Sequence, residues 1–217
     1  MSLGLSTGND GGVTSGIDFV IFDLGNVLIE WDRRNLYQKL ITDPDELDAF
    51  LDTVFTMDDN AELDKGTPLS EVAATVAERH PQHRELVMAF AARWKETLGE
   101  VISGTVEILE ELSKTGVGLL ALSNWGRDTF ASIEADYPFF ELFDGMVISG
   151  REGVVKPERK IFDIVCDRYD VTPERAVFID DSSANVVTAM TLGFDALLFD
   201  RPELLRQQLI YRQLLTS

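Results

Sequence analysis

Apolar residues gather in five short runs along the chain, and the first of them is rich in β-branched and aromatic side chains. These runs cover residues 17–22, 117–122, 145–148, 176–179 and 196–199. Almost continuous apolar runs are typical of strands in a parallel sheet that is covered on both faces. Apolar residues recur at helical spacing before the second, fourth and fifth runs, as in Val106, Leu109 and Leu112 before the second. The alternation predicts an α/β fold, a Rossmann-like, doubly wound parallel sheet of about five strands.

The segment between the first two runs is too long for a single crossover. More than 70 residues lie between Trp31 and Ser103, with helical patterns at 35–40, 44–55, 70–79 and 84–98. Asp43 before Pro44, and Ser70 before Glu71, are expected to begin two of these helices. We therefore expect a small α-helical cap domain over residues 31–103, inserted into a core formed by residues 17–30 and 104–217. Residues 1–16, rich in Gly, Ser and Thr, are expected to be a flexible leader.

The charge of the chain narrows the classes of partner. Its 217 residues include 38 acidic and 19 basic side chains, a formal net charge of −19. So acidic a surface repels nucleic acid and anionic membranes, whereas a local site can still bind a small phosphorylated metabolite. A lone cysteine, Cys166, excludes an intramolecular disulfide and is expected in the core. With one cysteine, no long apolar run and no signal-peptide pattern, we expect a cytoplasmic protein. For its oligomeric state we expect a monomer or a homodimer.

Polar residues that could carry chemistry follow the predicted strands. In open parallel sheets, ligands bind beyond the carboxyl ends of the strands. The residues placed there are Asp23, Ser123, Asn124, Lys156, Asp180 and Asp181. Three carboxylates on one edge are costly unless a cation binds them, and Mg²⁺ prefers such oxygen ligands. Lys156 could act as a fixed charge between a carboxylate and a phosphate, and the amides of Leu24 and Gly25 could bind phosphate oxygens.

Four motifs containing these residues resemble those of the haloacid dehalogenase-like hydrolase superfamily. They are FDLGNVL (22–28), LSNW (122–125), KPERKIF (156–162) and FIDDSSAN (178–185), in the order in which the family has them. A helical insert after the first motif is similar to the cap domain of the family. The form of the first motif resembles the subgroup of sugar-phosphate phosphatases that contains the bacterial α-glucose-1-phosphate phosphatase.

The resemblance implies a role for each matching residue. Asp23 would be the nucleophile that forms an aspartyl-phosphate, steadied by Lys156, while Ser123 and Asn124 bind the phosphoryl group. Asp181 would bind Mg²⁺ directly and Asp180 largely through water, together with Asp23 and the backbone carbonyl of Gly25. The implied activity is Mg²⁺-dependent hydrolysis of a small phosphate monoester, with a sugar phosphate as the favoured substrate.

Gly25 departs from the commoner pattern of the superfamily. Most of its phosphatases carry a second Asp two residues after the nucleophile, which protonates the leaving group and later activates water. A positive φ at Gly25 would explain why glycine stands there. Either another acid substitutes for it, or turnover is slow, or only good leaving groups react. Glu30 and Asp32 are candidates for a substitute acid, with exposed acids at a domain hinge as the simpler interpretation.

Two other functions remain open from the sequence. A metal-free 2-haloacid dehalogenase would suit Gly25, but the pair Asp180–Asp181 would repel an anionic substrate. A non-catalytic binding or regulatory module would also suit Gly25, although binding alone does not need Asp23, Lys156 and Asp181.

The cap is expected to select the substrate, because it closes over the site. Its candidate lining residues are Trp31, Phe55, Met57, Asp58, Asp59, Glu62 and Trp94. Apolar members of this set could instead form the core of the cap. Lys65, in the segment 63–66, could reach a substrate.

Overall fold

A computed structural model describes residues 16–216 and places the five apolar runs in one sheet. The strands are β1 (Phe19–Phe22), β4 (Gly118–Ser123), β5 (Gly145–Ile148), β6 (Ala176–Asp180) and β7 (Asp195–Leu198). All four pairings are parallel, and the strand order is β5-β4-β1-β6-β7. The predicted α/β fold is confirmed. Because β1 is central, the residue that follows it, Asp23, has a strand end on either side.

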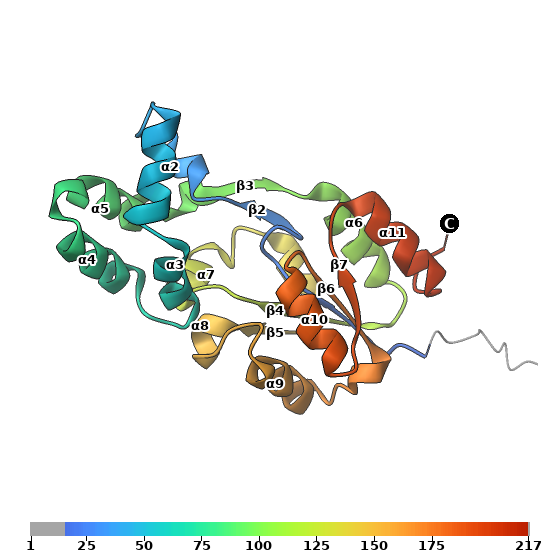
Figure 1. Ribbon diagram of the computed structural model, residues 1–217. Helices are drawn as coiled ribbons and strands as arrows, with labels where there is room; N and C mark the ends of the chain where they lie inside the picture. Colours follow the sequence, from blue (N-terminus) through green and yellow to red (C-terminus); the bar gives the residue numbers. More distant parts are fainter. Residues whose placement is uncertain (1–15, 217) are drawn as a thin grey trace, which may run out of the picture.

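Helices cover both faces of this sheet (Figure 1). Val20 and Phe22 of β1 pack on one face, and Ile21 between them packs on the other. The first face is covered by α6 (Ser103–Leu112), α7 (Arg127–Ile133) and α11 (Pro202–Tyr211). The second is covered by α9 (Arg159–Tyr169) and α10 (Ser183–Thr191). Burial of alternate side chains on opposite faces explains why the strands are continuously apolar.

The long segment after β1 forms a group of helices, as predicted. They are α1 (Arg34–Tyr37), α2 (Pro44–Thr53), α3 (Met57–Asp64), α4 (Leu69–Arg79) and α5 (Arg84–Arg93). Helix α3 was not expected, because its sequence MDDNAELD has little apolar periodicity. Its start is instead stabilised by a capping box, in which Thr56 Oγ1 accepts from the Asp59 N–H and the Asp59 carboxylate accepts from the Thr56 N–H.

The two predicted helix starts have different outcomes. Asp43 caps α2, since its Oδ1 accepts hydrogen bonds from the N–H groups of Asp45 and Glu46 at 2.9 and 3.0 Å. The prediction for Ser70 is wrong: α4 begins at Leu69, whose N–H donates to Asp128 Oδ2 at 2.9 Å. A carboxylate from α7 of the sheet domain therefore satisfies the helix start that a local hydroxyl was expected to satisfy.

A two-stranded antiparallel sheet joins the helical group to the parallel sheet. It pairs β2 (Ile29–Trp31) with β3 (Leu98–Val101), and Figure 1 shows the two strands side by side between the two parts. These strands correct the predicted helix 84–98, because α5 ends at Arg93 and a 3₁₀ turn, Trp94–Thr97, leads into β3. We propose residues 31–103 as the cap and 17–30 with 104–217 as the core. The predicted leader lies outside the described residues, Gly16 excepted.

Two expectations from composition can be compared with the structure. Cys166 is partly buried and packs against the apolar cluster beneath α9. Between residues 16 and 216, every helix is too short or too polar to cross a lipid bilayer.

Candidate active site

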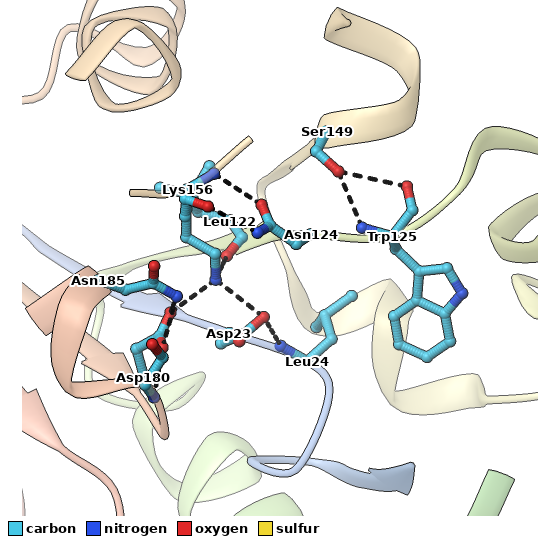
Figure 2. A network of polar contacts seen from close by, with 10 residues as sticks. Asp23, Leu24, Leu122, Asn124, Trp125, Ser149, Lys156, Asp180 and Asn185 are labelled. Atoms are coloured by element: carbon cyan, nitrogen blue, oxygen red, sulfur yellow. Dashed lines mark hydrogen bonds and ion pairs between the residues drawn. The ribbon is translucent and has the colours of Figure 1, made fainter. Parts of the chain in front are cut away.

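Lys156 lies at the centre of a buried polar network at the carboxyl ends of three strands (Figure 2). Only 3% of the residue is exposed. Its Nζ donates to Leu122 O of β4 at 2.7 Å and to Asp180 Oδ2 of β6 at 2.6 Å. It also lies 3.0 Å from Asp23 Oδ1, just after β1. The ammonium therefore joins three strand ends, and the convergence expected from the sequence is present.

Asp23 is held from its backbone as well as from its side chain. Its N–H donates to Ile179 O at 2.8 Å, and its Oδ1 accepts from the Leu24 N–H at 2.7 Å. The amide expected to bind phosphate thus contacts the carboxylate of Asp23 in this structure. The hydroxyl of Ser123, almost fully buried at the end of β4, lies close enough to lower the pKa of Asp23.

Asn124 fixes the segment that carries Lys156. Its Nδ2 donates to Lys156 O at 2.9 Å, and its Oδ1 accepts from the Lys156 N–H at 2.8 Å. Trp125, the residue after Asn124, is held by Ser149, whose Oγ accepts from the Trp125 N–H at 2.9 Å. No role was predicted for Ser149. Asn124 is therefore a positioning residue for Lys156, and its contact with phosphate stays a prediction.

Asp180 is completely buried and surrounded by donors. Besides Lys156, the Ser182 N–H donates to its Oδ1 at 2.8 Å, and Asn185 Nδ2 donates to the same oxygen at 2.9 Å. Asn185 is the last residue of the motif FIDDSSAN (178–185), and no role was predicted for it. Its signal was position: five residues after Asp180, it lies at the start of α10 and faces back toward the strand end.

The environment of the network changes two pKa values in different ways. Burial raises the pKa of Asp23 to about 7, although the charge of Lys156 lowers it, and the charge of Asp180 raises it further. Burial also lowers the pKa of Lys156, but the charges of Asp23 and Asp180 outweigh this effect, so the net pKa is raised. Lys156 thus stays an ammonium, and further positive charge would favour ionised Asp23.

Three carboxylates form a group that could hold a metal ion. Asp23, Asp180 and Asp181 each offer an oxygen, and these oxygens all lie within 4.8 Å of one another. Asp181 is the exposed member, whereas Asp180 already accepts from Lys156 and Asn185. Partial burial and the Asp180 charge raise the pKa of Asp181, and Asn26 lowers it. An all-oxygen set that accumulates negative charge fits a hard cation such as Mg²⁺.

The structure corrects the explanation proposed for Gly25. The positive φ in this turn belongs to Asn26, at 55°, and Gly25 is not among the positive-φ glycines. A Cβ added to Gly25 would meet no atom of the described residues within 4 Å. The backbone here therefore does not require glycine, and a side chain would have room.

A cavity of about 320 Å³ opens beside this network. Asp23, Lys156 and Asp181 line its core side. On its helical side the lining residues are Trp31, Met57, Asn60, Leu63, Asp64 and Trp94. Such a volume is at the lower end for sites of small organic ligands.

Only part of the expected cap lining is found in this cavity. Trp31, Met57 and Trp94 line it as predicted. The other five candidates are outside its lining: Phe55 is buried among the helices, Asp59 pairs with Arg79, and Asp58, Glu62 and Lys65 are exposed. Lys65 pairs with Glu62 at 3.0 Å. The residue just before Lys65 is an acid that does line the cavity.

That acid is Asp64, which lines the cavity in place of the predicted Lys65. Asp64 is partly buried at the end of α3, and its Oδ2 accepts from Asn60 Nδ2 at 3.3 Å. The two acids considered as proton donors lie elsewhere. Glu30 accepts from the Glu100 N–H at 3.3 Å, and Asp32 Oδ1 accepts from the Arg34 N–H at 2.8 Å; both are exposed and neither lines the cavity.

Comparison with known proteins identifies the family of this chain. The family model of haloacid dehalogenase-like hydrolases matches residues 17–191. The chain belongs to this family. It is 28% identical to a D-ribitol-5-phosphate phosphatase from Bacteroides thetaiotaomicron, over 81% of this chain and 88% of the relative. It is also 28% identical to the sesquiterpene phosphatase AstK from Aspergillus oryzae, over 48% of this chain.

Some curated relatives of this family member are much longer than the matched region. The match spans 54% of AstK and 35% of a drimenol cyclase from Aspergillus calidoustus, which is 24% identical over 88% of this chain.

Solved structures of the family confirm the fold. A family enzyme from Bacteroides thetaiotaomicron, in complex with magnesium and inorganic phosphate, gives a TM-score of 0.65 at 21% identity, covering 85% of this chain and 95% of that chain. The L-2-haloacid dehalogenase from Xanthobacter autotrophicus, with chloropropionic acid covalently bound, gives 0.61 at 18% identity, covering 90% and 83%. The same fold thus occurs in a magnesium and phosphate complex and in a dehalogenase with covalently bound chloropropionic acid.

Proposed function

We propose that this hydrolase is a Mg²⁺-dependent phosphatase that cleaves a small phosphate monoester through an aspartyl-phosphate on Asp23. The observation that carries the proposal is the grouping of Asp23 with Asp180 and Asp181 within 4.8 Å, beside the buried ammonium of Lys156. Such a site offers a carboxylate nucleophile, a fixed cation and a metal-binding edge.

In the proposed reaction, Asp23 attacks phosphorus and displaces the alcohol, and water then releases phosphate from Asp23. Lys156 holds the carboxylate in place and supplies a positive charge that needs no reorganisation. Ser123 would bind a phosphoryl oxygen, with the backbone amides of Leu24 and Gly25 beside it. Asp23, Asp181 and the Gly25 carbonyl would hold Mg²⁺, with Asp180 behind them; the bound ion supplies charge that stabilises the phosphoryl oxygens.

The acidic group argues against the two alternatives. A metal-free dehalogenase must bind an anionic haloacid, which Asp180 and Asp181 would repel. A purely regulatory module needs no carboxylate whose pKa is poised near 7 against a buried lysine, as it is at Asp23.

The lining of the cavity suggests two classes of substrate. A sugar or polyol phosphate is favoured by the relative that acts on D-ribitol 5-phosphate. Indole rings of Trp31, Trp94 and Trp125 could pack against a sugar. A second candidate, an isoprenoid phosphate, is favoured by the apolar lining residues Met57 and Leu63 and by the sesquiterpene phosphatase among the relatives.

The test is a panel of 4-nitrophenyl, sugar, polyol and isoprenoid phosphates, assayed with Mg²⁺ and after chelation. We expect Mg²⁺-dependent phosphate release, and a loss of about 10³-fold or more in kcat for Asp23→Asn, because the nucleophile is removed. Circular dichroism of Asp23→Asn controls for folding. Halide release from 2-chloropropionate that survives chelation, or full turnover by folded Asp23→Asn, would contradict the proposal.

A further inference from the structure

We propose that Asp64 is the general acid and base of this enzyme, delivering from the helical side the proton transfer that Gly25 cannot provide. The inference rests on the proposed phosphatase function. Asp64 is the one carboxylate on the helical side of the cavity lined by Asp23 and Lys156, among the described residues. It is close enough to Lys156 for the two charges to interact.

Contacts with the core hold the segment around Asp64 over the site. On one side, a Cβ added to Gly126, next to the LSNW motif, would lie 3.2 Å from Leu63 O. On the other, Gly66 has φ of +100°, and its Cβ would lie 2.6 Å from Gly150 O. A little further on, the Leu69 N–H donates to Asp128 of α7. Asp64 is thus flanked by backbone that packs directly on the core.

The surroundings of Asp64 favour the exchange of a proton at neutral pH. Burial raises its pKa to about 7, although Lys156 and the hydrogen bond from Asn60 lower it. The other charged groups that line the cavity are Asp23 and Asp181. A carboxyl group that is partly protonated near neutrality can give a proton in one step and take one in the next. Glu30 and Asp32 are exposed and do not line the cavity, so neither can reach a substrate bound in it.

The proton balance closes over the two steps. In the first, Asp23 forms a bond to phosphorus, the bond from phosphorus to the leaving oxygen breaks, and that oxygen takes the proton of the Asp64 carboxyl. The products are the alcohol, the aspartyl-phosphate and an Asp64 carboxylate. In the second, the Asp64 carboxylate takes a proton from the water that attacks phosphorus, which releases inorganic phosphate and restores Asp23.

The test compares Asp64→Asn with the wild type on 4-nitrophenyl, phenyl and ethyl phosphate. Because kcat/KM reports the first step alone, the variant should lose about 10²–10⁴-fold in kcat/KM on ethyl phosphate and less than about tenfold on 4-nitrophenyl phosphate. Phosphorylated protein, trapped by acid and detected by mass, should accumulate in the variant because its second step lacks a base. Glu62→Gln, in the same helix but exposed and outside the cavity, is the matched control.

A second variant distinguishes lost chemistry from disturbed structure. Gly25→Asp, at a position with room for a side chain, should restore ethyl phosphate hydrolysis in the Asp64→Asn background. Should Asp64→Asn fail to fold, Asp64→Ser provides the same comparison. Suppose that the wild type hydrolyses 4-nitrophenyl phosphate. If Asp64→Asn then loses the same factor in kcat/KM on all three esters, or loses nothing, the inference is overturned and the proposed function stands. Wild-type protein without phosphatase activity would overturn the proposed function and the inference together.

Discussion

The two sides of the cavity are held in place by different forces. On the core side, Lys156 has three oxygen partners and is almost fully buried, and Asp180 is inaccessible to solvent. On the helical side, Met57 is 55% exposed, and Asp64 accepts a long hydrogen bond from Asn60 as its one such contact within residues 16–216. Charge compensation fixes the first side, whereas backbone packing of the segment around Gly66 fixes the second.

This difference separates the chemistry that the fold holds constant from the chemistry that can change. Each buried charge on the core side depends on its partners, so replacing any one leaves the others uncompensated. On the helical side, Trp31 or Met57 could be exchanged without leaving a buried charge. We therefore expect the core side to tolerate few substitutions and the helical side to select the leaving group.

The largest test of the comparison is Lys156→Met, which removes the cation from between Asp23 and Asp180. Two buried carboxylates would remain without their ammonium, so we expect a loss of roughly 3–5 kcal/mol in the free energy of unfolding. Urea unfolding without Mg²⁺ measures it. Lys65→Met, at an exposed lysine, should change stability by less than about 0.5 kcal/mol. Equal effects of the two substitutions would show that charge compensation does not hold the core side together.

A smaller test addresses the helical side through Gly66→Ala. Alanine at φ of +100° is strained, and its Cβ would lie 2.6 Å from Gly150 O. We expect a loss of about 2–3 kcal/mol in the free energy of unfolding, with a lower kcat/KM, because the segment carrying Asp64 must move away from the core.

Gly116→Ala is the matched control for this substitution. Its φ is +87°, but the described part of the chain places nothing within 4 Å of an added Cβ. It should therefore lose only about 1–2 kcal/mol from backbone strain and keep its kcat/KM. Equal losses at the two glycines would mean that the contact with Gly150 contributes nothing to docking.

The same contrast explains how much could be predicted from the sequence. The core side was predictable because parallel strands bring their carboxyl ends together, so Asp23, Lys156 and Asp180 could be grouped from order alone. Lys156 could be placed without knowing its hydrogen bonds. Asn124 could also be placed, but its bonds to the backbone of Lys156 could not be foreseen, since they depend on the path of a loop.

The helical side was harder to predict because tertiary contacts determine it. Helix α3 has no apolar stripe to reveal it, and the predicted helix 84–98 ran through the 3₁₀ turn Trp94–Thr97 as far as the first residue of β3. Ser70 had the right local chemistry for a helix start, yet Asp128 from a distant helix took that role. The burial of Asp64 likewise arises from packing between segments that are far apart in the sequence, so the neighbouring Lys65 was chosen instead.

The smallest expected effect is on the pH dependence of stability, and it tests whether Asp64 is as desolvated as the comparison requires. Burial raises the pKa of Asp64 from 3.8 in the unfolded chain to about 7. Between these values the folded protein binds the extra proton, so this group's contribution to stability falls as pH rises through that window.

The substitution Asp64→Asn removes this fall in stability with pH. Relative to the wild type, the variant should therefore gain about 1–2 kcal/mol between pH 4 and pH 8, discounting the full shift because the residue is partly exposed. Urea unfolding at both pH values, without Mg²⁺, measures this difference, and the contribution of Asp23 cancels because both proteins carry it. Glu62→Gln, exposed in the same helix, gives the background. A constant difference between Asp64→Asn and the wild type across this range would show that Asp64 ionises as it does in water, and would place the proton donor elsewhere.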